Sequence, residues 1–521
     1  MHTSSIFAHL IGTNLESGPY QITCMGKIAT SLPTATITLD RMSSTALYRQ
    51  LYDQLREAIL SGRLSPGTRL PSTRELAGDL DIARNTVLNA FEQLYSESYL
   101  ERHVGDGTYV SAQLPDDLLR VKTQRRAEKR AKANGQPTSQ GGKSVSFLTT
   151  SPGTYIGPPR PFRTGTPALD AFPCKLWGRL LATRWSTSAP EILPYSNSAG
   201  YLPLRKAIAS YLSTTRGVQC VPEQLIITSG SQHALEIVTR TLIEPGDGAW
   251  IEEPGFLGAR AALTAAGARV IPVPVDTDGL NIAAGIGRCA DPRLIYVTPS
   301  HQYPLGMTLP LIRRLALLKL ATKTGAWVIE DDYDSEFRYV GRPLAALQGL
   351  DTDQRVIYIG TLSKVLFPSI RIGYIIAPPD LFDAFVRARC LAGHQSPTLE
   401  QAVLADFITE GHFARHIRRM RALYAERQQT LLKAAKPELD GLLDLQPSDT
   451  GMHLMGWLPE GIDDKAASRA AATSGVEVTP LSAYSIEPPK RGALRLGYTG
   501  YKPREIWHAT RRLAAALRDG N

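Results

Sequence analysis

The segment Thr361 to Tyr374, TLSKVLFPSIRIGY, concentrates reactive and anion-binding side chains directly after an apolar run, VIYIG. Lys364 follows the hydroxyl residues Thr361 and Ser363, and Arg371 comes seven positions later. A lysine in a desolvated site with cationic neighbours has a lowered pKa and becomes a nucleophilic amine. Hydroxyl and guanidinium groups hold anions through charge-assisted hydrogen bonds. The segment therefore predicts a buried strand that leads into a reactive lysine beside an anion site.

Apolar runs of strand length recur on both sides of this segment. They read QLIITSG, GAWIEEP, ARVIPVPVD, RLIYVTPS, AWVIEDD, VIYIGTL and YIIAPP, and most are bounded by Gly, Pro or Asp. Buried parallel strands have this pattern. Helical segments such as HALEIVTRTLI and LIRRLALLKLATKTG separate some of them, so we expect an α/β domain with a mostly parallel sheet. Ligands bind such sheets at the strand carboxyl ends, where Ser229, Pro254, His301, Asp331 and Lys364 fall.

Two further groups at these strand ends carry chemistry. Ser229, Gly230 and Ser231 open a helix after a strand, and free N–H groups there bind phosphate, although a plain helix cap has the same sequence. Asp331 and Asp332 end an apolar strand, where they could bind a metal, cap a turn or pair with a cationic ring nitrogen. No His or Cys accompanies them in sequence, which disfavours metal.

Taken together, these residues match the needs of pyridoxal 5′-phosphate. Lys364 would form an imine with the cofactor, and a carboxylate would keep the pyridine nitrogen protonated so that the ring withdraws electrons. The hydroxyls and Arg371 would hold the phosphate. The lysine of the opening segment is thus interpreted as a cofactor anchor and its neighbours as phosphate ligands.

The N-terminal part of the chain has a different pattern. TALYRQLYDQLREAILSG has apolar residues at helical spacing, and STRELAGDL begins a short helix with a Ser/Thr cap. DIARNTVLNAFEQLYSESYL is a second helix with Val87, Leu88, Phe91 and Leu94 facing inward, and HVGDGTYVS is a hairpin whose turn contains Gly105 and Gly107. This order predicts a winged helix-turn-helix. Arg84, Asn85 and Thr86 would lie on base edges, with Arg69, Ser72 and Arg74 near the phosphates.

Length, composition and charge indicate how these two regions are connected and in which compartment the protein is expected. The chain has 521 residues, 43% hydrophobic and 21% charged, with five scattered cysteines and a net charge of +9. Residues 119–143 hold eight Lys/Arg and one Glu in a Gly/Pro/Ser/Gln-rich context, which predicts a solvated linker that could also touch DNA phosphates. With no signal peptide and no apolar span, we expect a cytoplasmic protein with no membrane contact.

The predicted organisation has four parts. Residues 1–44 form an N-terminal extension, whose first 36 residues show no helical or strand period and include Met25 as an alternative start. Residues 45–113 form the winged helix-turn-helix. Residues 114–160 form the basic linker, and 161–521 form the α/β body.

LPSTRELAGDLDIARNTVLNAFEQLYSESYLERHVGDGTYV resembles the GntR-type winged helix of bacterial transcription regulators. The resemblance covers about residues 46–111 and implies that Arg74, Arg84, Asn85, Thr86 and the Gly105 wing contact double-stranded operator DNA. The chain departs from the family at Ala83, where Ser or Thr is usual, so a helix cap and a phosphate contact are lost there.

TLSKVLFPSIRIGY also looks like the cofactor-lysine motif of fold-type I aminotransferases. Together with EDDYDSEFRY (330–339) and TPSHQYPLG (298–306), behind a GntR-type winged helix, it resembles the MocR/GabR family of regulators. The resemblance runs from about residue 46 to 517. It implies a multidomain protein, an N-terminal winged helix-turn-helix plus an α/β fold-type I aminotransferase-like domain that binds pyridoxal 5′-phosphate.

The resemblance also implies roles for single residues. Lys364 would form the Schiff base, Asp331 would pair with the pyridine nitrogen, Tyr333 would bond the ring oxygen and Phe256 would stack on the ring. The phosphate would be held by Ser229, Gly230, Ser231, Thr361, Ser363 and Arg371. Arg495, in LRLGYTG, would take the carboxylate of an amino-acid ligand. The family assembles as a head-to-tail homodimer, so Tyr195 or Tyr201 would reach the neighbour's site.

Two functions follow from this resemblance, and a third is disfavoured. The leading interpretation is a transcription regulator that senses a small amino compound, or pyridoxal 5′-phosphate itself. The alternative is a working aminotransferase with an appended DNA-binding domain. Tyr303 argues against efficient turnover, because YPLG stands where aminotransferases commonly read NPTG. A body that serves only as a dimerisation scaffold is disfavoured by the intact Asp331 and Lys364.

Overall fold

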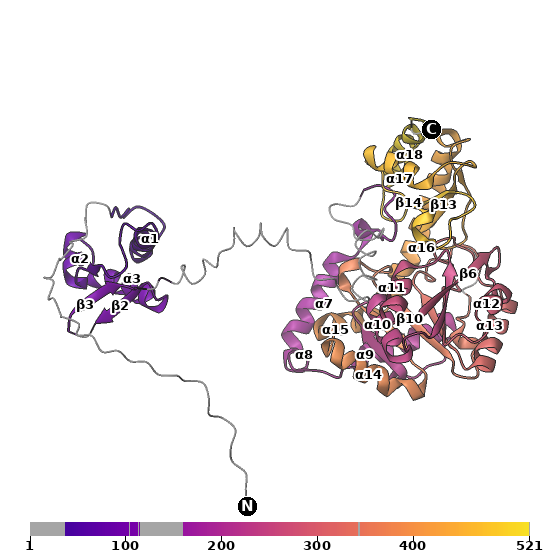
Figure 1. Ribbon diagram of the computed structural model, residues 1–521, viewed down its shortest axis with the longest axis horizontal. Helices are drawn as coiled ribbons and strands as arrows, with labels where there is room; N and C mark the ends of the chain where they lie inside the picture. Colours follow the sequence, from indigo (N-terminus) through magenta and orange to yellow (C-terminus); the bar gives the residue numbers. More distant parts are fainter. Residues whose placement is uncertain (1–36, 104, 113, 115–159, 342–343, 520–521) are drawn as a thin grey trace, which may run out of the picture. The chain divides into compact units, whose positions relative to one another are not determined.

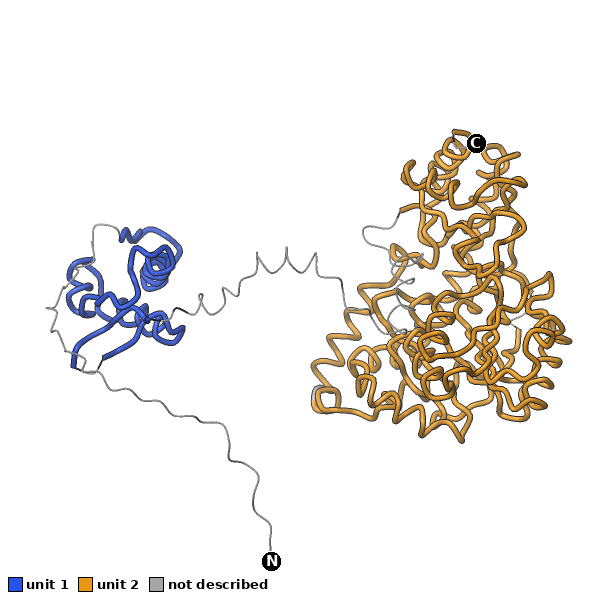
Figure 2. The backbone as a smooth tube through the Cα atoms, viewed as in Figure 1, with its two compact units in different colours: residues 1–136 blue, residues 137–521 orange. Residues whose placement is uncertain are grey.

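The computed structural model describes residues 37–103, 105–112, 114, 160–341 and 344–519, and divides the chain into two compact units, 1–136 and 137–521 (Figure 2). Most of the predicted N-terminal extension and basic linker lies outside the described residues. In the described part of the chain, no helix is long and apolar enough to cross a membrane.

The first unit is a three-helix core with a small antiparallel sheet (Figure 1). Its elements are α1 (Leu47–Leu60), β1 (Arg69–Leu70), α2 (Thr73–Asp79), α3 (Arg84–Ser96), β2 (Leu100–His103) and β3 (Gly107–Val110). Both β1 and β2 pair with β3 antiparallel. The predicted order of helix, short helix, helix and hairpin is therefore present. On α3, Val87, Phe91 and Leu94 are buried as expected, but Ala90 rather than Leu88 completes the buried stripe.

The core of the second unit is one eight-stranded sheet in the described residues, in the order β4-β11-β10-β9-β8-β5-β6-β7. The strands are β4 (Leu225–Thr228), β5 (Gly248–Glu253), β6 (Arg269–Asp276), β7 (Gly279–Leu280), β8 (Leu294–Val297), β9 (Trp327–Asp332), β10 (Val356–Thr361) and β11 (Gly373–Ile376). The strands β6, β5, β8, β9 and β10 are mutually parallel. The runs QLIITSG and YIIAPP, expected as parallel strands, are antiparallel: β11 pairs with β10 and β4 in that sense.

Helices cover both faces of this sheet and make three layers (Figure 1). One face packs on α10 (Ser231–Leu242), α11 (Leu257–Ala265) and α14 (Pro379–Gly393). The other packs on α12 (Ile282–Arg288) and α13 (Leu311–Thr324), and on α9 (Leu202–Arg216), α15 (Thr398–Thr409) and α16 (His412–Glu438). Strand residues alternate between these two layers, because successive side chains point to opposite faces. Within residues 160–224, the chain also forms the α-helices α7 (Cys174–Thr187) and α8 (Ala189–Ile192).

Residues 439–519, which follow α16, form what we call the C-terminal subdomain (Figure 1). It contains a second, four-stranded sheet. Its elements are β12 (Asp444–Leu445), β13 (His453–Trp457), α17 (Asp464–Thr473), β14 (Thr479–Pro480), β15 (Ala493–Gly497) and α18 (Pro503–Asp519). The strand order is β12-β13-β15-β14, with all pairs antiparallel. Residues from this subdomain and from the large sheet jointly line the cavity described below.

The two units have separate cores, which predicts separate unfolding. Phe91, at 1% exposure in the first unit, and Phe385, at 0% in the second, each fill a core position. Replacing a buried Phe by Ala typically costs about 3–5 kcal/mol. We therefore expect Phe91→Ala to lower only one calorimetric transition and Phe385→Ala only the other. Equal shifts of a single transition in both variants would contradict two independent units.

Candidate cofactor site and DNA-binding surface

A cavity of about 350 Å³ opens at the carboxyl ends of the parallel strands. It is lined by Gly165, Gly230, Ser231, Gln232, Phe256, Tyr296, Thr298, Tyr303, Asp331, Tyr333, Thr361, Ser363, Lys364, Pro368, Arg371, Met452, His453 and Arg495. Most residues singled out from the sequence of the body meet here. They come from separate strand ends, which the parallel register brings to one edge of the sheet.

Lys364 lies inside this cavity, just after β10. Its Nζ donates a hydrogen bond to the Gly165 carbonyl oxygen at 3.3 Å. Gly165 has φ +70°, a conformation that strains other residues, and a Cβ there would lie 2.6 Å from Nζ, so its backbone lies close to the amine. Burial, with the nearby Arg495, lowers the pKa of the Lys364 ammonium to about 8. A substantial fraction of the amine is therefore neutral and nucleophilic near physiological pH.

Asp331 presents one satisfied and one open carboxylate oxygen. Its Oδ2 accepts a hydrogen bond from the Tyr296 hydroxyl at 2.7 Å, whereas Oδ1 is buried without a hydrogen-bond partner in the structure. Burial raises the pKa of the Asp331 carboxyl to about 7. A buried open acceptor costs free energy until a donor reaches it. An N–H⁺ donor on a ligand would both satisfy Oδ1 and stabilise the ionised carboxylate, so this residue fits a protonated pyridine nitrogen.

An anion cradle adjoins the lysine. Gly230 (φ +101°) directly precedes α10, whose first turn has no side-chain cap, so its N–H groups face the cavity end of the helix. Arg371 donates to the Ser229 carbonyl oxygen at 2.8 Å, and a Cβ on Gly230 would lie 3.3 Å from the guanidinium. The Ser363 hydroxyl is buried without a hydrogen-bond partner. A helix N-terminus, an arginine and an unsatisfied hydroxyl together suit a phosphate group.

Aromatic and cationic side chains form the opposite wall. The rings of Phe256 and Tyr303 lie 5.4 Å apart at 78°, and both line the cavity. Arg495, from β15, lies with its guanidinium 4.4 Å from the Tyr303 ring centroid and 5.2 Å from that of Tyr484. Cation–π contact of this kind helps to hold an arginine in place.

Three residues considered for the site from the sequence do not line the cavity. The Ser229 hydroxyl is 3.3 Å from the Ser396 hydroxyl and does not line the cavity; only its backbone oxygen, bonded to Arg371, belongs to the cradle. Tyr195 is 92% exposed, its ring 6.3 Å from that of His394, and it does not line the cavity. Tyr201 is half-buried, packs against the main core and is also absent from the cavity wall.

Several lining residues were not assigned from the sequence. Tyr296 and Thr298 lie at the carboxyl end of the strand predicted from RLIYVTPS. That position could have identified them as candidate site residues. Gly165, Met452 and His453 come from segments remote from the lysine motif, and no local pattern marks them. Among the described residues, no group of three or more His, Cys, Asp and Glu side chains is placed to hold a metal ion.

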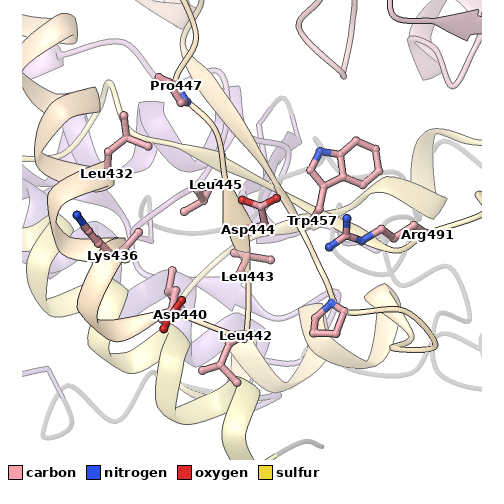
Figure 3. A pocket seen from close by; sticks show the side chains of 14 residues that line it. Leu432, Lys436, Asp440, Leu442, Leu443, Asp444, Leu445, Pro447, Trp457 and Arg491 are labelled. Atoms are coloured by element: carbon pink, nitrogen blue, oxygen red, sulfur yellow. The ribbon is translucent and has the colours of Figure 1, made fainter.

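A larger pocket of about 630 Å³ lies in and beside the C-terminal subdomain, between α16 and β13 (Figure 3). Leucine side chains, Trp457 and Arg491 line it, and Lys436, Asp440 and Asp444 add charges. None of the residues predicted to carry chemistry is among its lining residues. The smaller cavity is therefore the candidate site.

In the first unit, the residues predicted to contact DNA cluster around the start of α3. Arg84 and Asn85 are exposed, Thr86 is half-buried, and the Arg84 Nε donates to the Thr73 hydroxyl at 3.3 Å. Ala83, the residue before α3, makes no side-chain cap, as its type implies. Arg74 and Arg84 both line a shallow depression between α2 and α3.

The other predicted DNA contacts lie at the start of α2 and on the hairpin. Ser72 caps α2 in a reciprocal capping box with Glu75, so its hydroxyl accepts a hydrogen bond within the helix end. Arg69 is exposed on β1, and its guanidinium lies 3.1 Å from where a Cβ on Gly107 would stand. Gly105 lies in the exposed turn of the β2–β3 hairpin with φ +80°.

Comparison with protein families matches both units. Residues 47–110 match the bacterial regulatory proteins of the gntR family, and residues 173–513 match aminotransferase class I and II.

Relatives of similar length share the whole arrangement. The chain is 43% identical to the probable rhizopine catabolism regulatory protein MocR of Rhizobium meliloti over 92% of this chain and 96% of that protein. It is 32% identical to the pyridoxine biosynthesis transcriptional regulator PdxR of Corynebacterium glutamicum, over 86% of this chain and 91% of that one.

Solved structures match the second unit. LysN, the α-aminoadipate aminotransferase of Thermus thermophilus complexed with N-(5′-phosphopyridoxyl)-L-leucine, has a TM-score of 0.67 at 28% identity, covering 74% of this chain and 97% of that one. The kynurenine aminotransferase of Pyrococcus horikoshii, in complex with PMP, has a TM-score of 0.65 at 27% identity, covering 74% and 96%. The chain thus belongs to the MocR/GabR family of transcriptional regulators, in which a GntR-type helix-turn-helix domain precedes an aminotransferase class I and II domain.

Proposed function

We propose that this protein is a DNA-binding transcription regulator that holds pyridoxal 5′-phosphate as a Schiff base on Lys364 and senses a small amino compound. The observation that carries the proposal is one cavity that combines a lysine of lowered pKa, an open buried carboxylate oxygen and an anion cradle. The names of the matched structures support it, since one contains a phosphopyridoxyl compound and another PMP.

Each side chain has a part in holding the cofactor. Asp331 Oδ1 would accept a hydrogen bond from the pyridinium N–H, Tyr333 would donate to the ring oxygen, and Phe256 and Tyr303 would enclose the ring. The phosphate would be held by the backbone N–H groups of Gly230 and Ser231 and by Thr361, Ser363 and Arg371, and Ser229 would position Arg371 through its carbonyl oxygen. When bound, pyridoxal 5′-phosphate supplies an electrophilic carbon that exchanges the lysine amine for the amine of another compound.

Arg495 defines the class of effector. Its guanidinium faces the cavity from the C-terminal subdomain and is held against Tyr303 and Tyr484. An amino compound that also carries a carboxylate or a similar anion would contact Arg495 while its amine reaches Lys364. The variant in which pyridoxal 5′-phosphate itself is the effector needs no such contact, and the PdxR relative, a regulator of pyridoxine biosynthesis by name, supports it.

The partners of the proposal are operator DNA and a second copy of the chain. Residues 45–113 read double-stranded DNA through α3 and the wing, 114–160 serve as the linker, and 161–521 bind cofactor and effector. In a head-to-tail homodimer, the exposed Tyr195 would reach the neighbour's cavity. Effector and DNA are then coupled through a free energy shared by two sites.

A working aminotransferase is the second candidate. It is favoured by the intact cofactor residues and by 30% identity to the 2-aminoadipate transaminase of Thermus thermophilus, over 71% of this chain and 92% of that one. Tyr303 favours the regulator over the enzyme. Aminotransferases commonly have an asparagine at this position, which would bond the ring oxygen of the cofactor.

A visible-absorption titration tests the proposal directly. Purified protein supplied with pyridoxal 5′-phosphate should show a band that is absent in Lys364→Ala. A sensor predicts that one amino compound shifts this band to a new, stable position. Conversion to the pyridoxamine form, reversed by a keto acid, would instead establish transamination. No Lys364-dependent band at all would refute cofactor binding.

The lowered pKa of Lys364 predicts its reactivity. The neutral amine is the nucleophile, so in protein freed of cofactor, acetylation of Lys364 by a trace of acetic anhydride should rise with pH and reach half its maximum near pH 8. Peptide mass spectrometry measures it, with the exposed Lys436 as internal reference. A midpoint near the ordinary lysine value of about 10.4 would show that burial does not set the pKa.

A substitution on the DNA-binding surface of the first unit should leave cofactor binding by the second unit intact. Arg84→Ala removes a base-reading side chain and should weaken or abolish binding to an operator selected with the unsubstituted protein, at a cost of about 1–3 kcal/mol per subunit. Its cofactor spectrum should be unchanged. Arg49→Ala, an exposed arginine on α1 in an ion pair with Asp53, is the matched control. Loss of the cofactor spectrum in Arg84→Ala would contradict the division of labour.

A further inference from the structure

A buried aspartate, a histidine and a tyrosine form a hydrogen-bonded chain at the edge of the candidate cavity. Asp334 Oδ2 and Oδ1 lie 2.9 Å and 3.1 Å from His301 Nδ1, and both side chains are 1% exposed. The Tyr333 hydroxyl lies 3.0 Å from the same nitrogen. Tyr333 lines the cavity, whereas Asp334 and His301 stand behind it.

The number of protons on this nitrogen decides the direction of each hydrogen bond. A ring nitrogen carries either a proton or a lone pair, and a carboxylate only accepts. Asp334 therefore requires Nδ1 to carry a proton, whether the imidazole is neutral or charged. The Tyr333 oxygen then meets an N–H and can only accept from it. Its own hydroxyl proton has to be donated to a different acceptor.

Two glycine backbones pack closely against the imidazole. Gly306 and Gly451 lie against the ring: an added Cβ would come within 3.2 Å of Nε2 at the first and 2.1 Å of Cε1 at the second. Both glycines have φ above +90°, where other residues are strained. Within this close packing, the contacts with Asp334 and Tyr333 orient Nδ1 toward these two residues.

We infer that Asp334 and His301 are positioning residues that hold Tyr333 as a hydrogen-bond donor into the cavity, toward an anionic ring oxygen of the ligand. The inference rests on the proposed function, since the ring oxygen belongs to the proposed cofactor. Burial and the nearby Asp334 raise the pKa of the Tyr333 hydroxyl well above its usual value, so the proton to be donated stays in place. Without Asp334, Nδ1 of His301 could carry a lone pair, and Tyr333 could donate its proton to that nitrogen instead.

The readout is the pH at which the lysine–cofactor linkage loses its proton. A donor to the ring oxygen stabilises negative charge there, and that charge is fully developed only after the linked nitrogen has lost its proton. Donation from Tyr333 therefore lowers the titration midpoint of the visible band. Losing one hydrogen bond to a charged group should raise that midpoint by about one pH unit.

The experiment compares two substitutions at one position. Asp334→Leu has no acceptor, so Nδ1 can present a lone pair to Tyr333; its midpoint should rise by about one unit. Asp334→Asn keeps an accepting amide oxygen and should titrate close to the unsubstituted protein. Tyr333→Phe should raise the midpoint at least as far as Asp334→Leu, and the double variant Tyr333→Phe/Asp334→Leu should match Tyr333→Phe alone. His301→Gln, which removes the imidazole, provides a second route if Asp334→Leu fails to fold.

The outcomes separate this inference from the proposed function. If Tyr333→Phe shifts the midpoint but neither Asp334→Leu nor His301→Gln does, the positioning role is wrong while cofactor binding stands. Additive shifts in the double variant, or an equal shift in Asp334→Asn and Asp334→Leu, would also overturn it. Absence of a Lys364-dependent band in the unsubstituted protein would overturn the proposed function itself.

Discussion

The alternation of side chains along β9 is the constraint on which the site depends. Successive strand residues face opposite sides of a sheet, so Asp331 and Asp332 separate although they are adjacent in sequence. Asp332 turns to the helical layer that contains α9, where Arg216 lies 2.9 Å from its Oδ2 and the Tyr358 hydroxyl donates to it at 2.6 Å. Asp331 turns to the opposite face and the cavity. The two carboxylates therefore do not share a ligand.

The register of the neighbouring strands completes the cavity. Ile359 of β10 pairs with Asp331 and Tyr296 of β8 pairs with Ile329, all in parallel. This places the ends of three strands side by side, with Tyr296 beside the carboxylate and Lys364 just beyond β10. The buried Arg216–Asp332 pair anchors the same strand ends from the other face, and breaking such a pair typically costs about 3–5 kcal/mol. Core packing and site geometry thus rest on the same strands.

The cavity also joins the large sheet to the C-terminal subdomain. Met452, His453 and Arg495 line it from that subdomain, and Lys364 faces them from the sheet. Nearby, the Glu253 carboxylate at the end of β5 accepts hydrogen bonds from the backbone N–H groups of Ile486 and Glu487. A ligand that contacts both Lys364 and Arg495 bridges the two parts. Under the proposed function, coupling between effector and DNA would require a two-state element that the ligand biases.

The kinds of element, the two-part architecture and the candidate residues at the strand ends can be predicted from the sequence. Apolar runs bounded by Gly, Pro and Asp mark buried strands, because a strand buried on both faces needs apolar side chains at nearly every position. The TLSKVLFPSIRIGY segment also carries its lysine, hydroxyls and arginine within a short stretch. Which of these groups meet depends instead on the tertiary fold. It turned β4 and β11 antiparallel, directed the Ser229 hydroxyl to Ser396, and left Tyr195 exposed outside the cavity. It also brought Gly165, His453 and Arg495 to Lys364 from distant segments. Contacts of that range depend on packing between layers, which no local periodicity encodes.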